Sequence, residues 1–185
     1  ISCNSVTQKK LDTDAEKYEL VWQDEFNYSG LPDSTKWDYD QEGNDAGWGN
    51  REAQFYTRAN KENARVEDGV LKITARKKDF NGKEYTSARL MSKADWKYGR
   101  VEVNAKIPDG RGTWSAIWMM PGGWSFNDGN WPYVGEIDIM EHVGHETGVI
   151  HASAHSQDYQ WQKGTQKTAT VNFPTVAEEF HTYAL

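Results

Sequence analysis

The stretch GEIDIMEHVG, residues 135–144, places three carboxylates within six residues: Glu136, Asp138 and Glu141. In a β-strand, side chains two residues apart point to the same face. Glu136 and Asp138 therefore share a face, whereas Glu141, five residues after Glu136, would point away. A β-bulge adds one residue to a strand and resets the alternation. We predict a bulge at Ile139–Met140 that returns Glu141 to the face of the other two acids.

Two carboxyl groups on one strand face are suited to glycoside hydrolysis. With the bulge, Glu136 and Glu141 lie about 13 Å apart along the backbone, and inward-leaning side chains bring the carboxyls to roughly 5 Å. Retaining glycosidases use this separation, with one carboxylate attacking and the other protonating the leaving oxygen. Repulsion should raise the pKa of one acid, and Asp138 can orient the nucleophile. The alternative is a solvated acidic strand, although like charges on one sheet face are destabilising.

Two other catalytic chemistries have less support in the sequence. Four histidines lie near the acids, but no HExxH spacing occurs, and a catalytic metal is not expected. The GxSxG pattern of serine hydrolases is also absent. The histidines concerned are His142, His145, His151 and His155.

The composition argues against a nucleic-acid-binding protein and leaves a sugar-stacking cleft open. The 185 residues carry a formal net charge of −7, with a pI of about 5.2, so a basic nucleic-acid footprint is absent. The mean hydropathy is −0.88, and no apolar run is long enough for a transmembrane span. Nine Trp, nine Tyr and six Phe nevertheless supply many flat rings. Some should be core, and others could stack on sugars.

Apolar and polar residues alternate along much of the chain, which predicts antiparallel strands. The alternation is clear in VLKITAR (70–76) and RVEVNAKIP (100–108), and turn sequences rich in Gly separate such runs. Only TVAEEF (175–180) has a short helical period. The chain ends in EEFHTYAL, which looks like the start of a further strand. This pattern predicts an all-β sandwich or barrel.

A nearly continuous apolar run, GTWSAIWMMP, covers residues 112–121. Such a run is typical of a strand buried on both faces in the middle of a sheet. Trp114, Ala116 and Trp118 would share one face of that strand.

Residues 1–17 are polar, of mixed charge and without clear periodicity, and we interpret them as a tail or linker. Cys3 is the only cysteine, so the chain can form no internal disulfide. The beginning ISC followed by a polar stretch resembles the end of a bacterial lipoprotein signal, with Cys3 as lipid acceptor. A free thiol is the alternative. The lipoprotein hypothesis predicts an extracellular protein or one at the bacterial outer-membrane surface.

The acidic stretch resembles the ExDxxE signature of glycoside hydrolase family 16 in its bulged form. Three further segments are similar to the laminarinase branch, the endo-β-1,3-glucanases: WGNREAQFYT (48–57), SARLMSKADWKYGRVEVNAKIPDGRGTWSAIWMMP (87–121) and WPYVGEIDIME (131–141). The resemblance covers about residues 18–185. It implies one catalytic domain with a β-jelly-roll sandwich fold and a substrate cleft on the concave sheet.

The resemblance also implies roles for individual residues. Glu136 would be the nucleophile, Glu141 the general acid/base and Asp138 their partner. Six side chains would bind the polysaccharide: Trp131, Trp118, Trp114, Asn50, Arg89 and His155. For some of these there is a plainer alternative. Trp118 and Trp114 could be core residues, and Arg89 and His155 could be surface side chains.

Many members of this family bind a structural calcium ion, although catalysis requires no cofactor. Glu25 and Gly69 match two of the calcium-binding positions. A third ligand, a late aspartate, would lie beyond Leu185. Family domains also continue through further strands, so the domain over 18–185 is expected to be incomplete at its C-terminus.

Together these observations predict a monomeric, retaining, endo-acting hydrolase of β-1,3-glucan such as laminarin. Two alternatives remain open. The first is hydrolysis of another polysaccharide on the same fold, such as mixed-linkage glucan, agar, carrageenan or xyloglucan. The second is a non-catalytic carbohydrate-binding module, against which the intact set of three acids argues.

Overall fold

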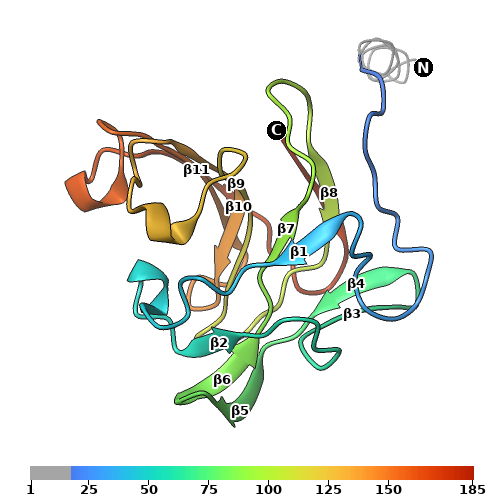
Figure 1. Ribbon diagram of the computed structural model, residues 1–185. Helices are drawn as coiled ribbons and strands as arrows, with labels where there is room; N and C mark the ends of the chain where they lie inside the picture. Colours follow the sequence, from blue (N-terminus) through green and yellow to red (C-terminus); the bar gives the residue numbers. More distant parts are fainter. Residues whose placement is uncertain (1–17) are drawn as a thin grey trace, which may run out of the picture. The chain divides into compact units, whose positions relative to one another are not determined.

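The structure is a computed structural model that describes residues 18–185, and it is built almost entirely of β-strands (Figure 1). The chain divides into two compact units, the first ending at Asp95 and the second covering Trp96–Leu185. Cys3, the candidate lipid acceptor, lies outside the described residues. The tail at 1–17, the single catalytic domain at 18–185 and the location of the protein therefore stay predictions.

The described part of the first unit, residues 18–95, contains seven strands in three small sheets. β1 (Trp37–Tyr39) pairs with β7 (Leu90–Ser92), and β3 (Ala64–Glu67) pairs with β4 (Val70–Ile73), both antiparallel. The third sheet has the order β2-β6-β5, in which β2 and β6 are parallel. Its strands are β2 (Gln54–Tyr56), β5 (Arg76–Phe80) and β6 (Lys83–Ser87). A short 3-10 helix, η1 (Gly47–Gly49), precedes β2.

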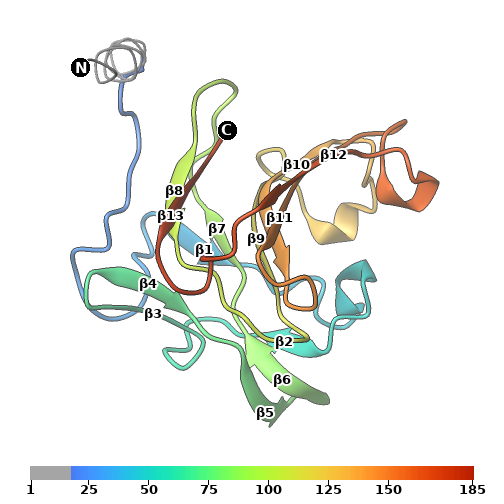
Figure 2. The ribbon, with the colours of Figure 1, turned by 180° about the vertical axis from the view of Figure 1, so that it is seen from behind.

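The second unit contains a four-stranded antiparallel sheet in the order β12-β11-β10-β9 (Figure 2). Its strands are β9 (Trp114–Met119), β10 (Glu136–Val143), β11 (Val149–His155) and β12 (Lys167–Asn172). A separate antiparallel pair joins β8 (Glu102–Ala105) to β13 (His181–Ala184). Two short 3-10 helices lie in the connections, η2 (Phe126–Asp128) and η3 (Trp161–Lys163).

The core of the second unit lies on one face of the four-stranded sheet. It gathers apolar side chains from the sheet and from the segments that carry β8 and β13: Ile107, Ile139, Met140, Ile150, Val176 and Tyr183. The predicted alternation over 100–108 is confirmed, because Val101, Val103, Ala105 and Ile107 are more buried than Glu102, Asn104 and Lys106. The burial of one sheet face leaves the opposite face available for chemistry.

A close backbone approach ends β10. The N–H of Gly144 donates to the carbonyl of Thr113 at 2.9 Å. A Cβ at position 144 would lie only 1.8 Å from the carbonyl oxygen of Gly110, so any side chain here would collide with backbone. Glycine is therefore required at the point where the acid-bearing strand meets the loop before β9.

Some strand predictions were wrong in detail. The run over 112–121 does form a strand, but it is not buried on both faces, because Trp114 is 52% exposed. The reason is that one face of this strand belongs to the sheet face opposite the core. In β4 the predicted alternation fails at its end, where Ile73 is 51% exposed. The helical period of TVAEEF forms turns rather than a helix, whereas the strand predicted near the C-terminus is confirmed as β13.

Among the described residues, no helix combines the length and the apolar character needed to cross a membrane.

Candidate active site

The predicted bulge in β10 is present where the sequence places it. Asp138 pairs with Ser153 and Glu141 with His151, so three steps along β10 match two steps along β11. The pairing of β10 with β9 shifts in the same place, between Asp138 and Met140. Ile139 and Met140 both lie in the core, at 7% and 1% exposure. Because these consecutive residues share the core face, all three acids point to the opposite face.

The neighbouring strands define what surrounds the acids on that face. On β11, the residues opposite Glu136, Asp138 and Glu141 are His155, Ser153 and His151. On β9, Trp118 is opposite Asp138 and Ala116 is opposite Glu141, while Trp114 is opposite Val143. The predicted common face of Trp114, Ala116 and Trp118 is therefore confirmed. The acids lie in a row between one strand that bears tryptophans and one that bears histidines.

An indole N–H donates to each of the two glutamates. The Nε1 of Trp131 donates to Oε2 of Glu136 at 2.5 Å, and the Nε1 of Trp114 donates to Oε1 of Glu141 at 2.9 Å. A hydrogen bond to a charged carboxylate is stronger than one between neutral groups and fixes its orientation. Each glutamate is therefore held by an aromatic residue that also presents a flat ring.

Asp138 lies between the two glutamates and is the most buried of the three acids, at 4% exposure. Burial and the nearby charges of Glu136 and Glu141 raise the pKa of Asp138 to about 8. Its Oδ2 lies 3.2 Å from Nε2 of His155, whose side chain is 9% exposed. At neutral pH, Asp138 therefore carries a proton, and it can donate a hydrogen bond to the neighbouring carboxylate of Glu136.

Burial also raises the pKa of Glu141 above its ordinary value. The hydrogen bond from Trp114 opposes this shift because it stabilises the charged form, while the charge of Glu136 reinforces it. A raised pKa is what a general acid needs in order to be protonated near neutral pH. The sequence predicts that repulsion raises the pKa of one acid. The pKa is raised for both Asp138 and Glu141, but burial is the larger cause, and the charge of Glu136 adds to it.

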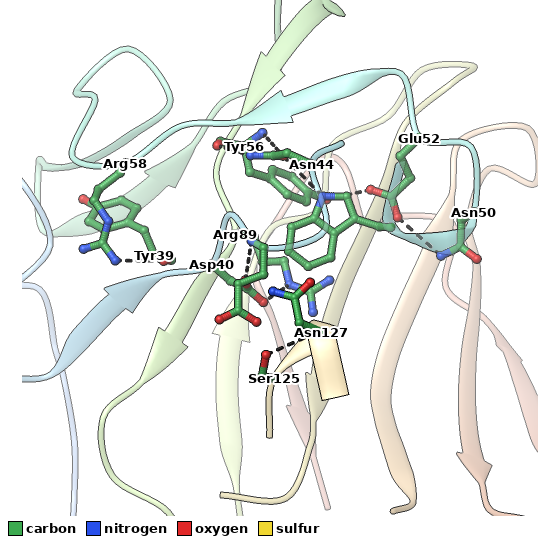
Figure 3. A network of polar contacts seen from close by, with 12 residues as sticks. Tyr39, Asp40, Asn44, Asn50, Glu52, Tyr56, Arg58, Arg89, Ser125 and Asn127 are labelled. Atoms are coloured by element: carbon green, nitrogen blue, oxygen red, sulfur yellow. Dashed lines mark hydrogen bonds and ion pairs between the residues drawn. The ribbon is translucent and has the colours of Figure 1, made fainter. Parts of the chain in front are cut away.

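Arg89 and Asn50, two of the residues predicted to bind sugar, belong to the first unit. The Nε of Arg89 lies 3.1 Å from Oδ2 of Asp40, and its guanidinium lies 3.9 Å from the ring centroid of Trp48 (Figure 3). The Arg89 side chain is only 14% exposed, so the alternative of a free surface side chain is wrong. Asn50 is exposed, and its Nδ2 lies 3.4 Å from Oε1 of Glu52.

The remaining predicted residues lie with the acids in the second unit. Trp131, Trp118, Trp114 and His155 are all brought to the acid face or against its residues. Trp114 is not a core residue, since it is 52% exposed, and His155 is not a surface side chain, since it is 9% exposed. That these side chains bind sugar stays a prediction.

The described residues contain one group of side chains close enough to ligate a metal together, namely Glu136, Asp138 and His155, whose ligand atoms lie within 4.8 Å of one another. The predicted calcium residues are not part of it. Gly69 lines a surface cavity of about 410 Å³ with Asp68 and residues 26–29, but Glu25 does not line it, and Lys72 bonds the Asp68 carboxylate at 2.8 Å. The described residues thus offer no complete calcium site, and calcium stays a prediction.

Two residues of the site were not predicted from the sequence. His151 is opposite Glu141 on β11. Its position could have been found, because His151, Ser153 and His155 follow the period of two on one strand face. Trp161 lies in η3, with its ring centroid 6.5 Å from that of Trp131. No spacing in the sequence indicates this contact, since it depends on the path of the loop.

The chain matches one protein family and is similar to named relatives and to solved structures. The family described as Glycosyl hydrolases family 16 matches residues 51–185. A beta-glucanase of Rhodothermus marinus is 51% identical over all of this chain and 64% of its own length. The solved laminarinase of that organism has a TM-score of 0.83 and 53% identity, covering 90% of this chain and 66% of the laminarinase. A solved mutant of SCLam, a non-specific endo-beta-1,3(4)-glucanase, has a TM-score of 0.84 and 44% identity, covering 91% of this chain and 67% of SCLam.

These similarities confirm the predicted all-β, jelly-roll fold class. This chain spans about two thirds of the length of these relatives.

Proposed function

Because the chain belongs to glycosyl hydrolases family 16, we propose that it hydrolyses β-1,3-glucan within the polysaccharide chain and retains the anomeric configuration. The observation that carries this proposal is the bulge in β10, which sets Glu136, Asp138 and Glu141 on one face of the sheet. β10 is paired with a strand on each side, and the bulge disrupts this pairing locally. Such bulges are common next to active sites.

In the first step, the carboxylate of Glu136 attacks the anomeric carbon and the bond to the leaving sugar breaks. Glu141, whose pKa is raised by burial, acts as the general acid and gives its proton to the leaving oxygen. The product is a glycosyl ester on Glu136. Trp131 holds the attacking carboxylate through its N–H, so the nucleophile keeps one orientation.

In the second step, Glu141, now a carboxylate, removes a proton from a water molecule. That water attacks the anomeric carbon and releases Glu136, so that two inversions give net retention. Asp138 keeps its proton at neutral pH because its pKa is about 8. It can donate a hydrogen bond to Glu136 when that group is an anion, and so stabilises the departing carboxylate.

Laminarin is the substrate we propose, on the strength of the similarity to the Rhodothermus marinus laminarinase. The similarity to SCLam, a non-specific endo-beta-1,3(4)-glucanase, makes mixed-linkage glucan the second candidate. The presence of both a proton donor and a nucleophile on one face favours an enzyme over a carbohydrate-binding module, because binding alone does not require the destabilising proximity of three acids.

The test is the release of reducing ends from laminarin, mixed-linkage glucan, agar and carrageenan, with Glu136→Ser as the inactive control. We expect laminarin to be the best substrate and Glu136→Ser to release nothing above background. NMR of the first products should show the β-anomer, and Glu141→Ala with azide should give a β-glycosyl azide. An inverted first product would exclude the covalent mechanism, and equal rates for the wild type and Glu136→Ser would exclude the proposed site.

A further inference from the structure

An exposed tryptophan lies close to Trp131, in a loop that the proposed reaction does not use. Trp161 begins η3, between β11 and β12, and is 52% exposed. Leaving half an indole in water forgoes much of the hydrophobic stabilisation that its burial would provide. One exposed aromatic residue is ordinary on a protein surface. The position and the support of this ring are what give it meaning.

The ring of Trp161 is in contact with the residue that holds the nucleophile. The ring centroids of Trp161 and Trp131 are 6.5 Å apart, with 34° between the planes, and Trp131 also lies 6.0 Å from the ring of His155. Trp131 in turn donates to Glu136. Trp161 therefore extends a group of rings that begins at the catalytic carboxylate.

The distance between the two indoles determines how they could meet a sugar. A flat ring held between two others needs two van der Waals contacts, roughly 7–8 Å in all. The separation of 6.5 Å leaves too little room for a sugar between Trp131 and Trp161. The rings are instead suited to lie side by side under successive sugars of one chain.

The loop that carries Trp161 is held in place by its own hydrogen bonds. The side chain of Gln160, 6% exposed, accepts from the backbone N–H of Gln162 at 2.8 Å. The hydroxyl of Thr165 donates to the carbonyl of Asp158 at 2.7 Å, and Lys163 donates to the carbonyl of Gln157 at 2.7 Å. A ring held this way loses little further conformational freedom when a ligand binds, which favours affinity.

The same loop provides an internal comparison. Tyr159 is 47% exposed, close to the value for Trp161, but the ammonium of Lys167 lies 4.4 Å from the centroid of its ring. A cation over an aromatic ring is an attractive interaction that competes with a sugar for the same surface. Tyr159 is therefore a matched control, equally exposed and on the same loop, with an intramolecular partner on its ring.

We propose that Trp161 is a sugar-binding residue that extends the glucan site beyond Trp131 at the end where Glu136 lies. It acts on chains long enough to reach both rings, and so sets a preference for longer substrates. This inference rests on the proposed glucanase function, which supplies the polysaccharide.

The test compares Trp161→Ala, Trp161→Phe and Tyr159→Ala by kcat/KM on laminarin oligosaccharides of increasing length. For Trp161→Ala we expect a loss of about 5- to 50-fold on the longest chains, the usual cost of a central aromatic contact, and less than about 2-fold on the shortest chain that is cleaved. Trp161→Phe should recover part of the loss, and Tyr159→Ala should stay within about 2-fold at every length. A loss that is equal at all lengths, or no loss on long chains, would overturn the proposal.

Binding separates this proposal from the proposed function. Oligosaccharide affinity is measured by calorimetry on Glu136→Ser, with and without Trp161→Ala. If the wild type cleaves no β-glucan, the proposed function fails. Weaker binding of long chains after Trp161→Ala still supports a sugar-binding role for Trp161, and unchanged binding rejects it.

Discussion

Two buried carboxylates, Asp40 in the first unit and Asp138 in the second, are each 4% exposed but have opposite surroundings. Asp40 is fully paired. Its Oδ2 meets the guanidinium of Arg89, its Oδ1 accepts from the backbone of Glu42, and its own N–H donates to the carbonyl of Arg89. Asp138 has two glutamates as neighbours, and the one ion-pair partner it has among the described residues is an imidazole, His155 at 3.2 Å, rather than a Lys or Arg.

The difference shows which part of the molecule serves stability and which serves chemistry. A buried charge is tolerated when a partner and hydrogen bonds compensate for its lost hydration, as at Asp40. At Asp138 the chain leaves that cost in place, and the result is a carboxyl that keeps a proton at neutral pH. Figure 3 shows Arg89 beside Asp40 in the first unit.

The largest expected effect comes from changing the alignment of the acids. Deleting Ile137 makes Glu136 adjacent to Asp138, so the two point to opposite faces. We expect activity on laminarin to fall by at least about 10³-fold, because attack and proton transfer both lose their geometry.

Deleting Met140 instead is the matched control, since it removes the extra residue of the bulge and keeps all three acids on one face. It should retain measurable activity, with a loss of about 2–5 kcal/mol in the free energy of unfolding from the missing core side chain. Circular dichroism verifies that both deletions fold. A folded Met140 deletion as inactive as Glu136→Ser would show that the bulge does not align the acids.

The second prediction concerns the paired carboxylate. Arg89→Met should lower the free energy of unfolding by about 3–5 kcal/mol, because it leaves Asp40 buried without its cation. Denaturant unfolding measures this change. Arg58→Ala is the control, since it breaks an ion pair with Asp38 whose side chains are 54% and 39% exposed, and it should cost less than about 1 kcal/mol. Equal effects of the two variants would mean that burial of the Asp40–Arg89 pair is unimportant.

The third prediction is a pH dependence of opposite sign at two aspartates. The raised pKa of Asp138 means that the folded chain binds more protons than the unfolded chain between about pH 4 and pH 8. Its contribution to stability is therefore complete below about pH 4 and is lost as the pH rises to about 8. Asp138→Asn should remove this loss and raise the free energy of unfolding by on the order of 1–3 kcal/mol at pH 8, with little change at pH 4.

Asp38 provides the contrast. A backbone hydrogen bond from Tyr39 and the nearby Arg58 lower the pKa of Asp38. Its contribution to the free energy of unfolding is therefore present above the ordinary pKa of an aspartate and is lost as the pH falls. Asp38→Asn should therefore destabilise the chain at neutral pH and not at low pH. Thermal melting of both variants across pH 3–9, at roughly one-unit steps, measures the two signs. If the melting temperatures of the wild type and of Asp138→Asn change in parallel with pH, the raised pKa of Asp138 is contradicted.

The smallest expected effect tests the hydrogen bond from Trp114. Trp114→Phe removes the N–H that stabilises the charged form of Glu141, so the pKa of Glu141 should rise further. The basic limb of the pH–rate profile should move up by less than about one unit, with kcat/KM reduced by less than about 10-fold. Trp161→Phe is the control because Trp161 is also 52% exposed, and it should leave that limb in place. A basic limb that moves equally in both variants would not come from Glu141.

Local patterns in the sequence predicted the strand and the common face of the three acids, because both depend on the period of two. Asp138 follows Glu136 by an even number of residues and Glu141 follows it by an odd number. This spacing was sufficient to predict the bulge and the face to which Glu141 points. The exposure of Trp114 was not predictable in this way, since an apolar run reads the same whether one face or both faces are covered. Burial of Arg89 against Asp40 likewise depends on residues 49 positions apart in the chain, and no local pattern encodes such a pairing.

The indole N–H groups of Trp131 and Trp114 have a consequence for observing the reaction. Each donates to a carboxylate whose charge changes in the proposed mechanism, Glu136 when it forms the ester and Glu141 when it gives up its proton. The light emission of an indole responds to charge placed against its ring nitrogen. Two of the nine tryptophans would therefore report on the two carboxylates, and replacing either by phenylalanine would show how much of the change in total emission during turnover comes from that indole.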